Sequence, residues 1–255
     1  MTQRSEIVKY INELFAEVNF PDYSYNGLQF EGSEKVTKIA AGVDATVEFF
    51  AEATRRGADF AVVHHGLFWK GGEWSRLDRI NLKIVKSLLA GNLNLFAMHL
   101  PLDAHPQFGN NALIASLLKA RVVAPFGGSR GNAVGVLAEF AKPISVADLK
   151  KKIEKEIGPI VTHLDFGAAR LRNLGIISGG GWSTVTDPMV YNGEVDAILT
   201  GEIIHQAVAS CRDRQVHMIS AGHYATETFG VKALGKHLAD KFELAFEFID
   251  LPTGL

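Results

Sequence analysis

The sequence predicts an α/β fold with two domains, in which helices are layered on mixed, largely parallel sheets. Short apolar segments alternate with amphipathic helical patterns along most of the chain, which is typical of parallel sheets buried on both faces. The composition, 47% hydrophobic and 21% charged with 8 prolines, is that of a soluble globular protein. A length of 255 residues suits one large domain or two modest ones.

The first half of the chain opens with a helix. Ile7, Ile11, Leu14 and Val18 recur at helical spacing, which predicts an amphipathic helix that ends before Pro21. The elements expected next are strands over 36–44, 59–66 and 93–100, and helices over 46–57, 79–92 and 111–120. Thr46 is expected to cap the first of these helices.

The glycine-rich segment PFGGSRGN, over 125–132, interrupts this alternation and is the best candidate for a domain boundary. A second α/β segment follows, with a helix that begins at Ser145, where Asp148 completes a capping-box pattern. Its expected strands cover 132–140, 160–167, 173–180, 195–202 and 216–220, and the tail over 227–250 is expected to form one more helix and strand.

Charge and composition exclude several classes of protein. Lys and Arg number 26 against 28 Asp and Glu, so no global positive field favours nucleic acid or an anionic membrane. A single cysteine, Cys211, cannot form an internal disulfide, and charges among the first twenty residues lead us to expect no signal peptide. We therefore expect a cytoplasmic protein, and no apolar segment is long enough to span a membrane.

Side chains capable of binding metal follow two of the predicted strands. His64 and His65 end the strand over 59–66, and His99, Asp103 and His105 follow the next strand. If the strands are parallel, their carboxyl ends meet at one edge of the sheet, where open α/β sheets bind their ligands. Each residue alone would more often be a hydrogen-bonded or turn residue, so the argument depends on the whole set.

A third strand end contributes His223 and Glu227, four residues apart, so that one helical turn places imidazole and carboxylate on the same face. Imidazoles and carboxylates together suit two divalent ions of zinc, manganese, iron or cobalt. Two such ions about 3.5 to 4 Å apart would polarise a substrate oxygen and lower the pKa of a bridging water, which indicates hydrolysis.

Other candidate residues have simpler interpretations. The triplet Gly179–Gly181 lies between a strand and a helix and could bind an anion, but a tight turn is the favoured interpretation. The three tryptophans are interpreted as packing residues. His163, His217 and His237 are interpreted as structural.

Five sequence blocks resemble the YbgI-type members of the NIF-three-like family, also described as GTP cyclohydrolase type two homologues. They are NGLQFEG (26–32), HHGLFWKG (64–71), HLPLDAHPQFGNNA (99–112), TGE (200–202) and AGHYATE (221–227). The resemblance extends over nearly the whole chain. Where many relatives have proline after the histidine pair, this chain has Gly66, which is expected to loosen the backbone there.

The resemblance implies a dinuclear metal centre, two α/β domains and a toroidal homohexamer. The implied ligands are His64, His65, Asp103, His223 and Glu227, and the implied cofactor is two divalent ions per chain. Since the carboxyl-terminal ligands must meet the amino-terminal ones, we expect a metal-binding domain over 1–126 plus 222–255 and a second domain over 127–221.

The supporting residues are a separate expectation. His105, Glu202 and His205 are candidates for proton transfer or for orienting the ligands, and His99 belongs to the same class.

Three functions remain open. The first is a metal-dependent hydrolase that opens the ring of GTP or acts on a related nucleotide or small molecule. The second is a dimetal hydrolase of phosphoesters or peptides. The third is a non-catalytic metal-binding hexameric scaffold or partner-binding protein, which would have a coordination shell filled by protein atoms.

Overall fold

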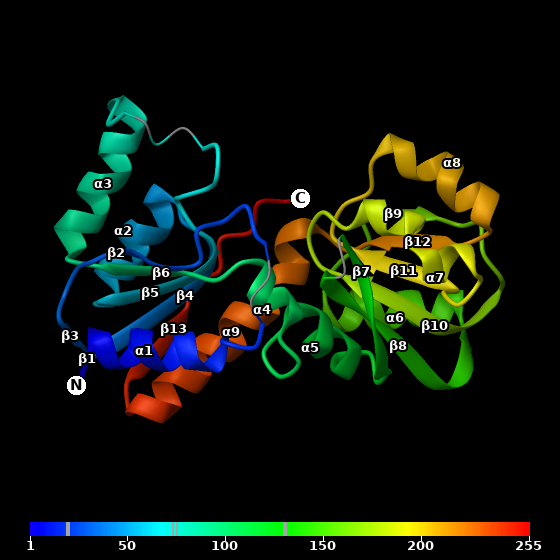
Figure 1. Cartoon of the computed structure of the whole chain (residues 1–255), viewed down its shortest axis with the longest axis horizontal. Helices are drawn as coiled ribbons and strands as arrows, with labels where there is room; N and C mark the ends of the chain where they lie inside the picture. The colour runs from blue at the N-terminus through cyan, green and yellow to red at the C-terminus, as the bar shows by residue number, and fades with distance from the viewer. Residues whose placement is uncertain (19–20, 73, 75, 130–131) are drawn as a thin grey trace. The chain divides into compact units, whose positions relative to one another are not determined.

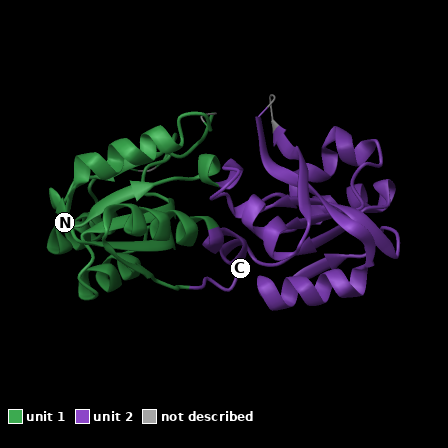
Figure 2. Cartoon of the chain, turned by 90° about the horizontal axis from the view of Figure 1, so that it is seen from below, with its two compact units in different colours: residues 1–102, 230–251 green, residues 103–229, 252–255 purple. Residues whose placement is uncertain are grey.

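The computed structural model describes residues 1–18, 21–72, 74, 76–129 and 132–255. The chain forms two compact units, which Figure 2 shows in different colours. Unit 1 contains residues 1–102 and 230–251, and unit 2 contains residues 103–229 and 252–255. The expected domains, 1–126 with 222–255 and 127–221, divide the chain at different positions.

Unit 1 is built on a five-stranded sheet in the order β13-β4-β5-β6-β2. Four of its strands are parallel, and β2 pairs with β6 in the antiparallel direction. The strands are β2 (Gly27–Phe30), β4 (Lys38–Asp44), β5 (Phe60–His65), β6 (Asn94–Ala97) and β13 (Ala245–Phe248). A separate two-stranded sheet joins β1 (Thr2–Gln3) to β3 (Lys35–Val36).

Helices lie on both faces of the unit 1 sheet (Figure 1). They are α1 (Arg4–Leu14), α2 (Val47–Arg55), α3 (Arg79–Gly91) and the later part of α9 (His223–Phe242). Phe49, Phe50 and Leu88 of α2 and α3 are buried in one apolar core with Val63 and Leu95 of the sheet. The alternation of strand and helix expected for this part of the chain is confirmed.

Helix α2 has the predicted cap, whereas α1 is shorter than predicted. The Thr46 side chain accepts a hydrogen bond from the Phe49 amide at 3.1 Å. Helix α1 ends at Leu14, and the Ala16 and Val18 amides then bond to carbonyls only three residues back. This tighter turn leaves the α-helical path before Val18, and residues 19 and 20 lie outside the described part of the chain.

Unit 2 is built on a six-stranded mixed sheet in the order β7-β8-β10-β11-β12-β9. The β10–β11 and β11–β12 pairs are parallel, whereas the β7–β8, β8–β10 and β9–β12 pairs are antiparallel. The strands are β7 (Arg121–Ser129), β8 (Asn132–Ser145), β9 (Thr162–Leu164), β10 (Arg170–Ile177), β11 (Ala197–Thr200) and β12 (His217–Ser220).

Two cores cover the two faces of this sheet. One contains Ile114 of α5 and Ile153 of α6 against Leu174, and the other contains Cys211 of α8 against Met218. The helical segments are α4 (Leu100–Ala104), α5 (Asn110–Leu117), α6 (Val146–Glu156), η1 (Trp182–Thr186), α7 (Pro188–Tyr191) and α8 (His205–Arg214). The predicted cap of α6 is confirmed, since Ser145 Oγ accepts from the Asp148 amide at 3.0 Å.

The glycine-rich segment over 125–132 is not a linker. Most of it belongs to a β-hairpin in which Phe126 is opposite Gly135 and Gly128 is opposite Ala133, while residues 130 and 131 lie outside the described part. A Cβ on Gly128 would lie 1.9 Å from the Asn132 carbonyl oxygen, so glycine allows the two strands to approach closely. The first unit therefore ends earlier, at Leu102.

The length and polarity of the helices bear on whether any of them could cross a membrane. Among the residues that the structure describes, every helix is too short or too polar to cross a bilayer.

Candidate metal centre

Three histidines gather at the carboxyl edge of the unit 1 sheet. His64 and His65 end β5, and His99 follows the neighbouring parallel strand β6. One ligand atom from each lies within 4.8 Å of the others, and the ring of His64 is centred 4.7 Å from that of His65 and 5.0 Å from that of His99. The parallel arrangement expected from the sequence therefore brings these three imidazoles together.

Carboxylates behind this group hold two of the rings. His65 Nδ1 is 2.8 Å from Asp44 Oδ1, and His99 Nδ1 is 2.8 Å from Asp22 Oδ1. A carboxylate at Nδ1 fixes the tautomer and directs Nε2 away from it, as in metal-binding histidines. Burial alone would raise the pKa of Asp22, but the hydrogen bond and charge of His99 outweigh it and lower that pKa.

The loop after the histidine pair is tightly packed rather than loosened by Gly66. A Cβ on Gly66 would lie 2.5 Å from the Ala97 Cβ and 2.5 Å from the Gln29 amide group. Gln29 Oε1 accepts hydrogen bonds from the Leu67 and Phe68 amides. The expectation of a looser backbone at Gly66 is therefore wrong, because the glycine makes room for neighbouring side chains.

A tryptophan from the same loop lies beside the histidines. The Trp69 ring is centred 4.9 Å from that of His99 at an angle of 73°, and its Nε1 donates to the Gly66 carbonyl at 2.8 Å. Trp69 thus combines packing with a flat apolar wall next to the imidazoles.

Unit 2 contains a second candidate group at the start of α9. His223 Nε2 is 3.2 Å from Glu227 Oε1, one helical turn later, and His223 Nδ1 is 2.6 Å from Glu202 Oε1. Burial favours the neutral imidazole, but hydrogen bonds and charges from Glu227 and Glu202 outweigh it and raise the pKa of His223 to about 9. The two carboxylates therefore favour positive charge at this position.

Asp103 is buried in unit 2 and held at one oxygen. Its Oδ1 accepts from Asn110 Nδ2 at 2.7 Å and from Ser178 Oγ at 2.8 Å. The side chain is 4% exposed, so these two donors compensate for much of the loss of hydration. They also fix the plane of the carboxylate, as neighbours of ligating carboxylates do.

The Gly179–Gly181 triplet forms the tight turn favoured by the sequence, and it lies against the His223 and Glu227 pair. Gly179 has a φ of 61°, and a Cβ there would be 2.1 Å from Glu227 Oε1 and 3.0 Å from His223 Nε2. The Gly179 carbonyl accepts from the Gly201 and Glu202 amides. Glycine at this position thus lets the turn approach the two candidate ligand atoms closely, because these atoms occupy the space that a side chain would need.

The three tentative proton-transfer residues have different surroundings. Glu202 contacts His223, which is the ligand-orienting position that was one of its two expected roles. His105 Nδ1 accepts from the Gln107 and Phe108 amides at 3.1 Å each, so these bonds hold the turn after α4. His205 is exposed at the first position of α8.

Several site residues were missed by the sequence analysis. Asp22, Asp44 and Ser178 contact candidate ligands or their neighbours, yet no motif marks them. Asp44 is the last residue of the buried strand β4, and that position was the available signal.

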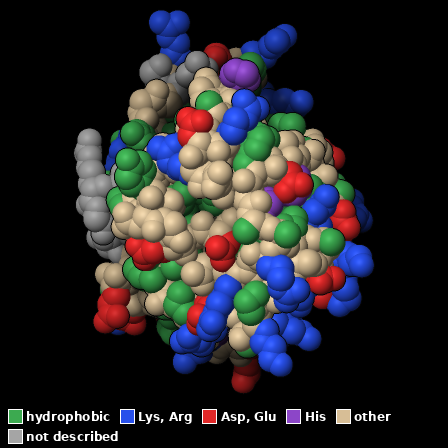
Figure 3. Space-filling model, turned by 90° about the vertical axis from the view of Figure 1, so that its right-hand side faces the viewer, with side chains coloured by type: hydrophobic (Ala, Val, Ile, Leu, Met, Phe, Trp, Pro, Cys, Tyr) green, Lys and Arg blue, Asp and Glu red, His purple; other side chains and the backbone are tan. Residues whose placement is uncertain are grey.

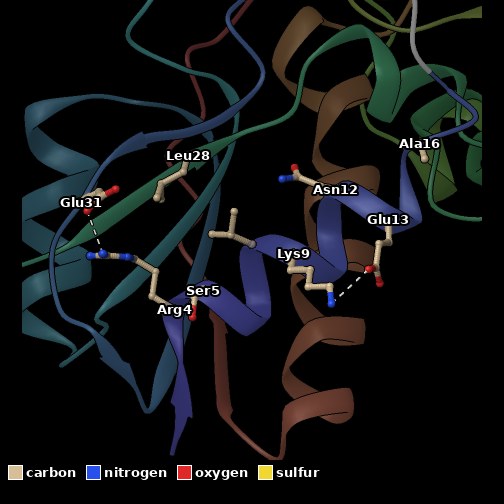
Figure 4. Close-up of a pocket in the computed structure, with 9 residues that line it drawn as sticks. Arg4, Ser5, Lys9, Asn12, Glu13, Ala16, Leu28 and Glu31 are labelled. Atoms are coloured by element: carbon tan, nitrogen blue, oxygen red, sulfur yellow. Dashed lines mark hydrogen bonds and ion pairs between the residues drawn. The ribbon is translucent and has the colours of Figure 1, made fainter.

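Away from these groups, charged side chains of both signs lie close together on the surface. A groove of about 570 Å³ in unit 1 is lined by Arg4, Lys9, Glu13, Glu31 and others (Figure 4), with ion pairs between Arg4 and Glu31 and between Lys9 and Glu13. On the face in Figure 3, Lys and Arg side chains are interspersed with Asp and Glu, and hydrophobic side chains form small separate patches.

Comparison with known proteins decides the family. Residues 2–253 match the model of the family described as Duf34/NIF3 (NGG1p interacting factor 3). The chain belongs to the Duf34/NIF3 family. The resemblance stated from the sequence blocks is therefore confirmed.

The curated relatives bear one common name and match this Duf34/NIF3 chain over nearly their whole length. A protein of Pyrococcus horikoshii named GTP cyclohydrolase 1 type 2 homolog is 40% identical over 253 residues, covering 99% of each chain. One of the same name from Escherichia coli K12 is 37% identical, covering 98% of this chain and 99% of its own.

Solved structures agree with this fold. "Structural genomics, protein ybgI, unknown function" matches with a TM-score of 0.91 at 37% identity, covering 100% of both chains. TTHA1606 from Thermus thermophilus matches with a TM-score of 0.87 at 33% identity, also covering 100% of both. The predicted two-part α/β fold with helices on mixed sheets is thus confirmed.

Proposed function

We propose that this Duf34/NIF3 protein is a metal-dependent hydrolase with a dinuclear centre, acting on a nucleotide or a related small molecule. The proposed ligands are His64, His65, Asp103, His223 and Glu227. The name shared by the curated relatives, GTP cyclohydrolase 1 type 2 homolog, supports guanine nucleotides as the first substrates to test.

The observation that carries the proposal is that a carboxylate contacts Nδ1 of each of two candidate histidine ligands. His65 and His223 each have a carboxylate oxygen at Nδ1, at 2.8 Å and 2.6 Å, so Nε2 is the atom directed toward a ligand. The same support recurs at Asp103, whose Oδ1 is oriented by two donors.

The donor set fits divalent first-row metals. It combines imidazole nitrogens with carboxylate oxygens, a mixture that suits zinc, manganese, iron or cobalt better than magnesium or calcium. Gly179 lets the turn pack against Glu227 and His223 without displacing their ligand atoms, as a Cβ would. When bound, a pair of such ions would activate water and polarise a substrate oxygen.

The chain's own residues would orient the ligating imidazoles and exclude water from the site. Glu202 would hold the Nδ1 proton of His223, and Asp44 would do the same for His65. Trp69 presents an aromatic face beside the histidines, where a planar base could stack and water would be displaced.

The first experiment measures metal before activity. Elemental analysis of the purified chain should give at least two divalent ions per chain, and a His64→Ala, Glu227→Ala double variant should contain two fewer. Asp240→Asn is the matched control, since Asp240 is an exposed residue of the same helix as Glu227. Full metal content in the double variant would eliminate the proposed ligands.

The second experiment separates substrates. Metal-loaded protein is offered GTP, nucleotide phosphoesters and peptides, and ring opening, phosphate release and cleavage are followed separately. Turnover that disappears in the double variant identifies the substrate class. Stoichiometric metal without turnover of any of them would favour the non-catalytic scaffold.

We propose that the assembly and compartment also follow the family resemblance. The chain would form a homohexameric ring in the cytoplasm, where its single cysteine, Cys211, stays reduced.

A further inference from the structure

Unit 2 contains another group of metal-ligand type, apart from the proposed centre. His163 lies in β9, Asp165 follows that strand directly, and His217 begins the neighbouring strand β12. One ligand atom from each of the three lies within 4.8 Å of the others. None of the three belongs to the five proposed ligands of the dinuclear centre.

The strand register explains why these side chains meet. β9 and β12 are antiparallel, with Leu164 opposite Met218 and His163 opposite Ile219, so the next pair in register is Asp165 with His217. His163 and Asp165 are two residues apart and share a face of the sheet, and a directly opposed residue shares that face too. The backbone therefore preorganises all three side chains on one side of the sheet.

His217 is oriented as a metal-binding histidine would be. The ring is buried, and its Nε2 donates to the Ala168 carbonyl at 2.8 Å, which places the proton on that nitrogen. The Gly167 amide donates to Nδ1 at 3.4 Å, a long contact that requires the lone pair on Nδ1. Nδ1 lies 3.1 Å from Asp165 Oδ1, so this lone pair is beside a carboxylate.

Gly167 is needed for this arrangement. A Cβ on Gly167 would lie 2.5 Å from Cδ2 and 2.8 Å from Nε2 of His217. The backbone of 165–168 can therefore wrap around the imidazole only because residue 167 has no side chain.

His163 supplies the second nitrogen. Its Nε2 is buried and has no hydrogen-bond partner within the described part of the chain, although it lies 3.9 Å from Asp165 Oδ1. A buried polar nitrogen without a partner is unfavourable unless another group satisfies it. Burial lowers the pKa of His163, while the nearby Asp165 acts in the opposite direction, and the net effect favours the neutral imidazole that binds metals.

Asp165 would supply negative charge and a route from solvent to the site. Its side chain is 72% exposed, so an ion can arrive from solvent, and its carboxylate would offset part of the positive charge. An Asp165–His217 hydrogen bond without an ion would need a second proton on the ring and would still leave His163 Nε2 unsatisfied. A bound cation satisfies all three groups together.

We propose that His163, Asp165 and His217 bind a single divalent ion of the zinc type, with water completing the coordination. Two imidazoles and one carboxylate are the ligands of borderline ions such as zinc, and three protein ligands leave an open position. Ligand atoms of a tetrahedral zinc ion are separated by roughly 3.4 Å. The observed separations of 3.1 and 3.9 Å lie on either side of this value, so a small rotation of the exposed Asp165 suffices.

The test compares Asp165→Asn with Asp213→Asn in zinc titrations followed by calorimetry and elemental analysis. Asp213 is an exposed residue of α8 in the same unit, so both variants lose one surface charge. We expect Asp165→Asn to lose one equivalent of zinc, or to bind that equivalent at least about 10-fold more weakly. Asp213→Asn should titrate like the unaltered chain. Equal stoichiometry and affinity in all three proteins would overturn the proposal.

Diffraction at the zinc absorption edge locates the ion independently of the dinuclear centre. Crystals of the unaltered chain soaked in zinc should show a peak at about 2.0 to 2.2 Å from His163 Nε2 and His217 Nδ1. The peak should persist in the His64→Ala, Glu227→Ala variant and vanish in His163→Gln. Saturating zinc without a peak at these atoms would contradict the proposal, whatever is bound elsewhere.

Discussion

At the scale of single residues, the candidate ligands are organised by acidic partners distant in the sequence. Asp22 precedes His99 by 77 residues, Asp44 precedes His65 by 21, and Glu202 precedes His223 by 21. No local spacing reveals such pairs, because each depends on which strands and loops become neighbours. The candidate ligands and Glu202 could be found in the sequence, whereas Asp22 and Asp44 could not.

Replacing the Glu202 carboxylate tests this support directly. Glu202→Gln keeps the size of the side chain but removes the charge 2.6 Å from His223 Nδ1. We expect divalent-metal affinity to fall about 10-fold or more, as when other such partners are removed. Metal titration calorimetry measures the change, and Glu154→Gln, at an exposed position of α6, is the control. Unchanged affinity in Glu202→Gln would remove this carboxylate from the account.

Gly179 and Gly180 form a matched pair for a second test. A Cβ at Gly179 would lie 2.1 Å from Glu227 Oε1, whereas one at Gly180 would meet nothing within 4 Å. Gly179→Ala should therefore displace Glu227 and weaken metal binding. It should also destabilise the fold by roughly 1–2 kcal/mol, because φ at this position is positive. Gly180→Ala should change neither the metal affinity, measured by calorimetry, nor the stability, measured by urea unfolding. Equal effects of the two substitutions would refute the role of Gly179.

Cys211 should be almost inert in the folded chain. It is buried in the core of unit 2, and burial raises the pKa of its thiol to about 11. At pH 8 roughly one thiol in a thousand would be ionised, so iodoacetamide should react slowly with the folded chain and rapidly in urea. Mass spectrometry measures the modification. Rapid labelling without denaturant would show that α8 does not protect this residue.

At the scale of helices and strands, the sequence was most informative at helix starts, where a single residue decides whether the helix is capped. The caps at Thr46 and Ser145 were predicted because their oxygen can accept from an amide two or three residues later. The hairpin of β7 and β8 was misinterpreted as a boundary, because the glycines of 125–132 could serve either a linker or close strand contact. Only the pairing partner distinguishes these roles.

The Ser145 cap should contribute measurably to the stability of α6. Ser145→Ala removes the acceptor of the Asp148 amide, which is 3.0 Å away, and should destabilise unit 2 by about 1 kcal/mol. Hydrogen exchange at the Asp148 amide should accelerate, while Ser145→Asp should restore both values. If Asp148 exchanges at the same rate in Ser145→Ala, the cap contributes nothing.

At the scale of the whole molecule, composition and alternation predicted two α/β parts, and the structure has two compact units. The exact division was not predictable, because α4 and α9 each contain residues of both units. Continuous helices carry no composition change at such a point. Assembly belongs to this scale too: sedimentation velocity should give a hexamer at micromolar concentration, and a monomer alone would contradict that proposal.

The most direct measurement of the central claim is anomalous diffraction from the purified chain at the absorption edge of the metal found by elemental analysis. The account predicts two neighbouring peaks, with His64, His65, Asp103, His223 and Glu227 as their protein ligands. Metal-replete crystals with no ion at these five side chains, or with a single ion bound by none of the carboxylates, would contradict it.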